Sequence, residues 1–212
     1  MNTPLIITIS RQLGSGGEYI GQQLAGQLQI QYIDRRLISE VAKELSVPED
    51  EVAAREEQIQ SLWKAFTQSS SFNSNMDIPA FLKYPPTDYQ LFTVESDIIK
   101  KIAKEGSAII MGRCGFHVLK GRPNCVNIFL YADKEVRAKR VAEENSVAQD
   151  KAMEMIVESD RKRAQYIEAF TKKNWTDAAV YDLSVNTGKL GLNKTIDLML
   201  NYLDVMKRNT NQ

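Results

Sequence analysis

The hydrophobic positions of this 212-residue chain form two patterns, short apolar runs and longer amphipathic stretches. The short runs are rich in β-branched residues, as is typical of strands buried on both faces of a sheet. They cover residues 5–10, 31–34, 107–111, 125–131 and 181–187. Between them, apolar residues recur every three or four positions, which predicts helices. These stretches cover residues 20–28, 35–45, 88–105, 133–144, 149–172 and 192–208. Strands that alternate with helices predict an α/β fold with a five-stranded parallel sheet.

A polar stretch that contains several prolines interrupts this alternation. Residues 67–90 are rich in Ser, Asn, Pro and Tyr, and they follow a charged segment, residues 48–68, that predicts one more helix. A loop of this length is uncommon inside a compact domain and often carries function. We therefore expect residues 1–212 to form one domain with an inserted flap at residues 46–90.

The composition is that of an ordinary globular protein, with 43% hydrophobic and 25% charged residues. It excludes a disordered chain, a collagen and a disulfide scaffold. Because 27 Lys and Arg balance 27 Asp and Glu, we expect no binding to nucleic acid or to a membrane surface. The first apolar run is too short for a signal peptide, and no run approaches the roughly 20 apolar residues of a membrane span. These features favour a cytoplasmic protein.

Few side chains in this sequence are suited to bind a metal. The two cysteines, Cys114 and Cys125, and the single histidine, His117, lack the spacing of a zinc site. Free thiols fit a reducing compartment. We predict no protein-bound structural metal, and no catalysis by Cys114 or His117, which have no acid to complete such a constellation.

The first apolar run leads into a glycine-rich segment, residues 11–18, that opens a helix. Backbone N–H groups at such a junction, together with the positive end of the helix dipole, suit phosphate oxygens. The candidate cofactor-binding residues are Arg11, Gly14, Ser15, Gly16 and Gly17. The established pattern, GxxxxGK followed by Ser or Thr, is not met, because Gly17 stands at the lysine position and Glu18 at the hydroxyl position. A plain flexible turn is therefore the alternative interpretation.

Several segments, taken in order, resemble the cytidylate-kinase-like family, a divergent branch of the P-loop nucleoside monophosphate kinases. They are ITISRQLGSGGEYIGQQLA, YIDRRLI, IIMGRCGFHVL, NIFLYADKEVRAKR, ESDRKRAQYI and YDLSVNT. The resemblance covers about residues 5–205 and is weakest over residues 46–90. It implies a P-loop nucleoside-monophosphate-kinase-like three-layer fold, with an acceptor-binding flap at residues 46–90 and a helical lid at residues 137–163.

The resemblance also implies the reaction: transfer of the γ-phosphoryl group of ATP, with Mg²⁺, to a small-molecule nucleotide, most simply CMP or dCMP. Such transfer depends mainly on positioning and charge neutralisation, and arginine holds phosphate in a planar, bidentate grip. Arg113 follows Gly112 at the end of an apolar run and looks like the arginine that grips the acceptor phosphate. The next residue, Cys114, departs from the family's aspartate.

The lid candidates come from the two helices on either side of a polar break at residues 144–150. Arg137 and Arg140 share one helix face, and Asp160 and Arg163 are also three residues apart. By resemblance, the three arginines neutralise the phosphates and act in catalysis with Arg113, while Asp160 orients an arginine. A basic, solvated helix face is the alternative interpretation of each cation.

A third group of candidates, Asp34, Arg35 and Arg36, lies at a junction that faces the acceptor in the family. Together with Arg113 they are the predicted substrate-binding residues, although Asp34 can also serve only to cap a helix.

The absent loop lysine keeps the function open. Arg11 is the nearest cation that could replace it. Without a replacement, the chain is a nucleotide-binding regulatory protein with little turnover; a kinase for another small acceptor is a further alternative. No sequence pattern indicates a base preference or an oligomeric state.

Overall fold

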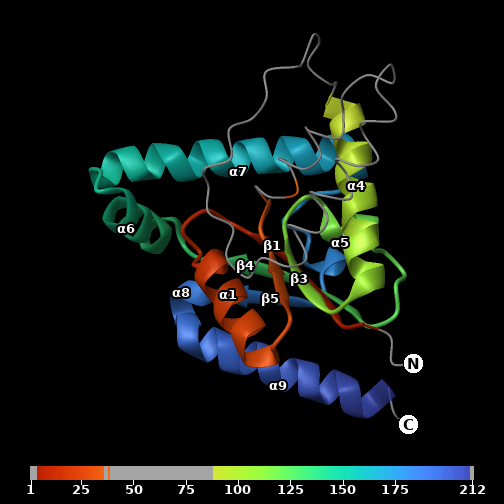
Figure 1. Cartoon of the computed structure of the whole chain (residues 1–212). Coiled ribbons are helices and arrows are strands. Elements are labelled where there is room, and N and C mark those ends of the chain that lie inside the picture. The colour runs from red at the N-terminus through yellow and green to blue at the C-terminus, as the bar shows by residue number, and fades with distance from the viewer. Residues whose placement is uncertain (1–3, 36–37, 39–87, 211–212) are drawn as a thin grey trace, which may run out of the picture.

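The computed structural model describes residues 4–35, 38 and 88–210 (Figure 1). The predicted helix at residues 48–68 and nearly all of the predicted flap at residues 46–90 lie outside this described part. The predicted helix at residues 35–45 lies outside it except at Arg35 and Ile38.

Five parallel strands form one sheet, as predicted. They are β1 (Ile6–Arg11), β2 (Gln31–Ile33), β3 (Ala108–Met111), β4 (Cys125–Tyr131) and β5 (Leu183–Asn186), in the order β2-β3-β1-β4-β5. In the centre, Ile7 of β1 pairs with Ile109 on one side and Val126 on the other. All strand bounds agree with the sequence prediction to within two residues. The signal is clearest in β1 and β3, which are mostly apolar runs buried at every position between the helices of the two faces.

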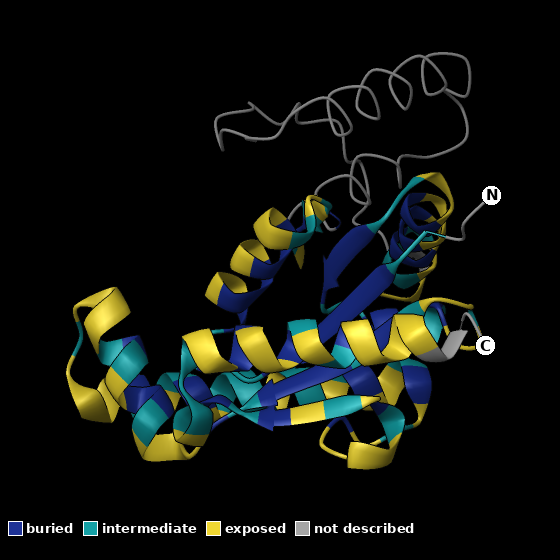
Figure 2. Cartoon of the chain, turned by 90° about the horizontal axis from the view of Figure 1, so that it is seen from below, coloured by how far each residue is buried: buried dark blue, intermediate teal, exposed yellow. Residues whose placement is uncertain are grey.

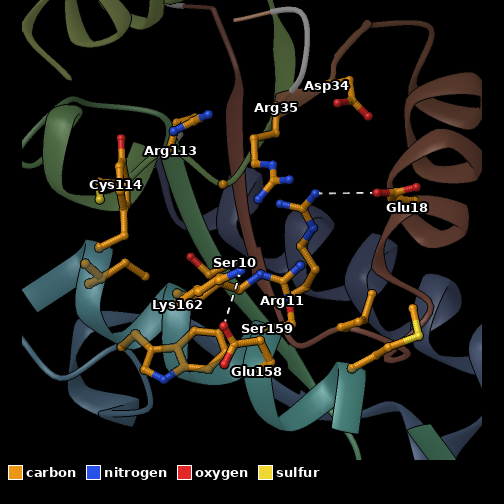
Figure 3. Close-up of a pocket in the computed structure, with 17 residues that line it drawn as sticks. Ser10, Arg11, Glu18, Asp34, Arg35, Arg113, Cys114, Glu158, Ser159 and Lys162 are labelled. Atoms are coloured by element: carbon orange, nitrogen blue, oxygen red, sulfur yellow. Dashed lines mark ion pairs between the residues drawn. The ribbon is translucent and has the colours of Figure 1, made fainter. Parts of the chain in front are cut away.

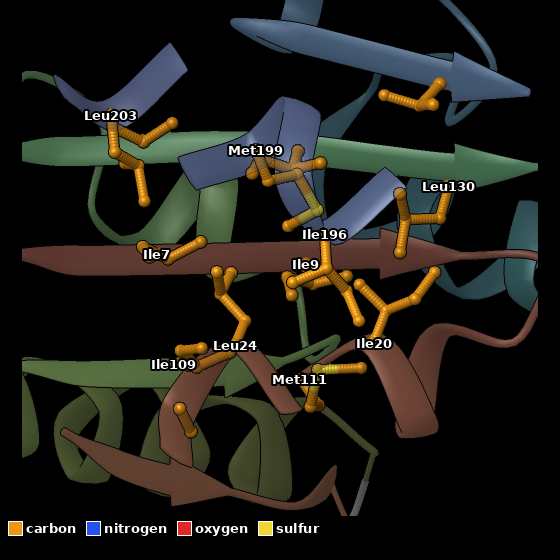
Figure 4. Packing of buried hydrophobic residues seen from close by; sticks show 14 residues of the cluster. Ile7, Ile9, Ile20, Leu24, Ile109, Met111, Leu130, Ile196, Met199 and Leu203 are labelled. Atoms are coloured by element: carbon orange, nitrogen blue, oxygen red, sulfur yellow. The ribbon is translucent and has the colours of Figure 1, made fainter. Parts of the chain in front are cut away.

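Helices α1 (Gly17–Leu28) and α9 (Leu192–Thr210) cover one face of the sheet (Figure 1). Their apolar positions pack on every second strand residue, including Ile7 and Ile9, to form the largest core cluster (Figure 4). Helices α4 (Asp88–Glu105) and α5 (Gly115–Val118) cover the opposite face and meet Ile6 and Ile110. Figure 2 shows the buried strands between helices whose outer faces are exposed.

Helices α6 (Lys134–Asn145) and α7 (Gln149–Thr171) form an antiparallel pair, joined at the predicted polar break. Ala138 and Val141 of α6 pack on Ala152 and Ile156 of α7. The predicted lid region, residues 137–163, lies within this pair. Two short helices, η2 (Ala178–Val180) and α8 (Thr187–Leu190), flank β5.

The strand order creates a topological switch point between β1 and β4, at the centre of the sheet. The chain leaves β1 toward the β2 edge and leaves β4 toward the β5 edge, although β1 and β4 are neighbours. Open α/β sheets bind ligands outside the carboxyl ends of the strands at such a point. Among the described residues, no helix combines the length and apolar character that a membrane crossing needs.

Candidate active site

A cavity of about 690 Å³ lies between the carboxyl ends of β1 and β3 and helix α7 (Figure 3). Its charged lining is mostly cationic: Arg11, Arg35, Arg113, Lys162 and Arg163, against Glu18, Asp34 and Glu158. Two of the cations, Arg11 and Arg35, reach the cavity from different strand ends and lie close together (Figure 3). This excess of positive charge suits an anionic ligand.

Arg163 lines the cavity from α7, and one of its nitrogen donors lacks a partner in the described part of the chain. Its Nη1 is buried and has no hydrogen-bond partner among the described residues. Burial, and then the nearby charges of Arg11 and Arg35, lower the pKa of the Arg163 guanidinium to about 10, so it still carries its charge at neutral pH. A buried donor without a hydrogen-bond partner is costly, and a bound anion would satisfy it.

The glycine loop between β1 and α1 borders the cavity, which Leu13 and Glu18 line on either side of it. Gly14 and Gly16 adopt left-handed conformations, each with a φ of 76°. A Cβ at residue 14 would lie 2.6 Å from the carbonyl oxygen of Arg137. Glycine is therefore required at this turn, both by conformation and by close packing.

Side chains of α6 and α8 hold the carbonyl groups of this loop. Arg137 Nη1 donates to the Leu13 carbonyl at 3.4 Å, Arg140 Nη1 to the Gly14 carbonyl at 3.3 Å, and Thr187 Oγ1 to the Ser15 carbonyl at 2.7 Å. In a trans peptide the N–H points opposite to the carbonyl. The N–H groups of the next residues therefore point away from α6 and α8. That of Ser15 donates to the Gln12 carbonyl at 3.2 Å, and Gly14 and Gly16 themselves are not among the residues that line the cavity.

The placement of Arg137 and Arg140 differs from the sequence expectation. Neither lines the cavity. Arg137 is 2% exposed, and its Nη1 lies 2.9 Å from Oδ2 of Asp160, which itself lies outside the cavity lining. Its Nε donates to the Ala132 carbonyl at 3.0 Å, and Arg140 Nη2 donates to the Thr187 carbonyl at 3.2 Å. The two arginines face the carbonyl side of the glycine loop. Their N–H groups, which we expected to bind phosphate, donate instead to backbone carbonyls and to Asp160.

Arg113 lies in a strained turn directly after β3. Gly112, Arg113 and Cys114 have φ values of 72°, 51° and 55°, and each left-handed non-glycine residue costs about 1–3 kcal/mol. Glu95 of α4, only 1% exposed, lies 3.3 Å from Arg113 Nε and accepts a hydrogen bond of 2.8 Å from the Tyr166 hydroxyl. The Arg113 guanidinium also lies over the Tyr166 ring, 5.3 Å from its centre. These contacts fix Arg113 at the cavity wall.

Of the remaining candidates, Asp34 and Arg35 line the cavity, and Arg36 lies outside the described residues. Burial raises the pKa of the Cys114 thiol to about 12, so this cavity residue is a neutral thiol at physiological pH. The described residues contain no group of three or more His, Cys, Asp or Glu side chains that could hold a metal ion.

The sequence did not point to Glu95, Tyr166 or Lys162 as site residues. Glu95 and Tyr166 are isolated polar positions on amphipathic helices, and only the packing of α4 near α7 brings them to Arg113. Lys162 lies between the predicted candidates Asp160 and Arg163, and this neighbourhood is the signal by which the sequence could have indicated it.

The strand order and the glycine loop after β1 define an α/β fold of the P-loop kinase type. The chain belongs to the cytidylate kinase-like family, whose model matches residues 6–189. The family match and the relatives named cytidylate kinase support a phosphotransferase.

Comparison with individual proteins agrees with this assignment. The chain is 24% identical over 206 residues to a cytidylate kinase from Saccharolobus islandicus, covering 97% of this chain and 94% of the relative. It is 28% identical over 128 residues to one from Pyrobaculum calidifontis, covering 60% and 69%. An uncharacterized protein from Eubacterium ventriosum has a similar structure, with a TM-score of 0.70, 25% identity and coverage of 94% and 98%. A gluconokinase from Sinorhizobium meliloti shares the fold, with a TM-score of 0.55, 13% identity and coverage of 100% and 98%.

Proposed function

We propose that this protein transfers the γ-phosphoryl group of ATP to a nucleoside monophosphate, with CMP or dCMP as the preferred acceptor. The observation that carries the proposal is the cationic cavity, in which the buried Nη1 of Arg163 has no partner among the described residues. The triphosphate of ATP and the single phosphate of the acceptor, placed end to end, supply the negative charge that such a cavity lacks. The relatives named cytidylate kinase support cytidine as the base.

The glycine loop is the donor subsite in this proposal. The N–H groups of Gly14 and Gly16 bind phosphate oxygens, since α6 and α8 already hold the neighbouring carbonyls. Glu18 and Asp34 are the cavity carboxylates that would hold Mg²⁺, whose usual ligands are one or two carboxylates plus substrate phosphates and water. When bound there, Mg²⁺ would neutralise part of the negative charge of the donor phosphates.

Arg113 binds the acceptor phosphate. Glu95 and Tyr166 hold its guanidinium in one orientation, so little side-chain entropy is lost when the acceptor binds. In the transfer, an oxygen of the acceptor phosphate forms a bond to the γ-phosphorus, and the bond from the γ-phosphorus to the β–γ bridging oxygen breaks. The products are ADP and the nucleoside diphosphate.

Arg163 neutralises the charge on the transferring group. It lies on α7, which covers the cavity, and its pKa stays above neutrality. In a site from which water is excluded, a preorganised cation of this kind contributes about 2.7–4 kcal/mol to lowering the barrier.

The proposal is tested with the purified chain, Mg²⁺ and ATP against a panel of CMP, dCMP, UMP, AMP, GMP and phosphorylated or hydroxylated small molecules. We expect ADP formation with CMP or dCMP at the highest kcat/KM. Turnover only with a non-nucleotide acceptor would contradict the acceptor assignment. Tight ATP binding without turnover on any acceptor would instead identify a nucleotide-binding protein.

A further inference from the structure

Gly17 occupies the position at which the common phosphate-binding loop has its lysine, and its backbone does not require glycine. It is the first residue of α1 and is absent from the residues with positive φ. A Cβ added there would lie 2.8 Å from Cγ and 2.9 Å from Cβ of Arg11. The three nearest atoms all belong to Arg11. The stem of Arg11 is therefore what demands a residue without a side chain at position 17.

The charged end of Arg11 continues into the cavity. The side chain is only 7% exposed, and its Nη2 lies 3.7 Å from Oε1 of Glu18, the residue at the loop's usual hydroxyl position (Figure 3). Its Nη1 lies beside Gly112, where a Cβ would come within 2.7 Å. The guanidinium is thus held between the first turn of α1 and the end of β3, next to Arg35.

We propose that Arg11 is the phosphate-binding cation of this loop, supplied from the end of β1 instead of from the first turn of α1. Gly17 leaves room for its stem, and Glu18 orients its guanidinium until a nucleoside triphosphate binds. Positions 11, 17 and 18 then form one unit that replaces the lysine and hydroxyl of the common loop. This inference rests on the proposed function for its ligand, but its packing requirement does not.

An arginine at position 11 binds phosphate differently from a lysine in the loop. Its planar fork can contact two phosphate oxygens at once, whereas a lysine ammonium acts as a point charge. A lysine at position 17 and an arginine at position 11 cannot both fit, because their stems would overlap. Moving the cation back to α1 therefore requires the removal of Arg11 down to glycine, since an alanine would retain the Cβ that lies 2.9 Å from the added atom.

The packing requirement is tested by a double-mutant cycle on melting temperature. Gly17→Ala should lower the melting temperature of the wild-type chain by about 2–12 °C, the range for an overpacked site in a chain of this size. In an Arg11→Gly background the same change should have little effect. Gly16→Ala is the matched control, because its Cβ would clash with the Leu192 side chain and its φ is 76°. Its cost should be equal in both backgrounds. Equal costs of Gly17→Ala in the two backgrounds would overturn the packing requirement.

The ligand role is tested on Arg11→Gly and Arg11→Gly/Gly17→Lys, with the exposed Arg208→Ala as control. Calorimetry measures the affinity for ATP and for inorganic tripolyphosphate, and single-turnover kinetics measures transfer. We expect Arg11→Gly to weaken triphosphate binding at least tenfold and to slow transfer by about 10²–10³-fold, and the double variant to recover at least tenfold in rate. Wild-type affinity and rate in Arg11→Gly would overturn the role of Arg11. If the wild-type chain transfers to no acceptor while Arg11→Gly still loses triphosphate binding, the proposed function fails and the inference on Arg11 holds.

Discussion

Arg137 and Arg163 lie on the same pair of helices, yet their guanidinium groups have opposite surroundings. Arg137 is 2% exposed and meets Asp160 and the carbonyls of Ala132 and Leu13. Arg163 is three residues from Asp160, but its buried Nη1 has no partner among the described residues. Asp160 makes its ion pair with Arg137, and the cavity cation is left for a ligand. We therefore infer that Arg137 stabilises the protein, and we propose that Arg163 binds phosphate.

We expect the largest difference between the two arginines in the melting temperature of the Arg137→Ala variant. Loss of this guanidinium leaves two carbonyls and Asp160, which is 21% exposed, without their donor. Breaking a fully buried ion pair costs about 3–5 kcal/mol, and the two lost hydrogen bonds to carbonyls add to the cost of this partly buried pair. We expect the melting temperature to fall by about 6–20 °C. Lys139→Ala, an exposed change on the same helix, is the control and should melt like the wild type. A melting temperature within two degrees of wild type would show that Arg137 does not stabilise the fold.

Arg163→Ala should give the reverse pattern. Transfer in a single turnover should slow by about two orders of magnitude or more, because a preorganised cation is lost. The melting temperature should change little, since Arg163 Nη1 has no partner among the described residues and the side chain lies near Arg11 and Arg35. Transfer at the wild-type rate would place Arg163 outside the reaction.

Arg113→Ala tests whether this cavity arginine binds the acceptor phosphate and not the phosphates of ATP. A charged hydrogen bond contributes about 1.5–3 kcal/mol, so KM for the acceptor should rise roughly 10- to 150-fold. ATP affinity should stay close to wild type. Steady-state kinetics in both substrates decides the point, and equal losses for both would make Arg113 a structural residue like Arg137.

The smallest effect concerns Cys114, which lies beside Arg113 in the cavity. The arginine alone would lower the thiol pKa, but burial outweighs it and raises the pKa to about 12. Because the thiolate is the reactive form, iodoacetamide should not label Cys114 in the native chain between pH 7 and 9, whereas the unfolded chain should be labelled. Rapid labelling of native Cys114, measured by mass spectrometry of its peptide, would show that the cation dominates over burial.

The sequence predicted the fold more fully than the site, and the reason is physical. Strand and helix patterns are local, so the apolar runs at β1 and β4 identified their strands to within a residue. The three-residue spacing of Arg137 and Arg140 correctly placed them on one face of α6. Spacing does not tell which neighbour that face meets, and here the neighbours are loop carbonyls and Asp160.

Long-range packing also explains what the sequence did not indicate. Glu95 and Tyr166 are 71 positions apart and meet only because α4 and α7 pack near the end of β3. Gly17 seemed to be a defect in the phosphate-binding pattern until the structure placed the stem of Arg11 over it. In each case the informative contact joins segments whose approach depends on the complete fold.

The most direct test of this account is a crystal structure of the chain with CMP, Mg²⁺ and a non-hydrolysable ATP analogue. We predict phosphate oxygens within hydrogen-bond distance of Arg11, Arg113 and Arg163, while Arg137 keeps its contacts with Asp160 and the Leu13 carbonyl. Phosphates bound instead by Arg137 or Arg140, or bound outside the cavity, would contradict this prediction.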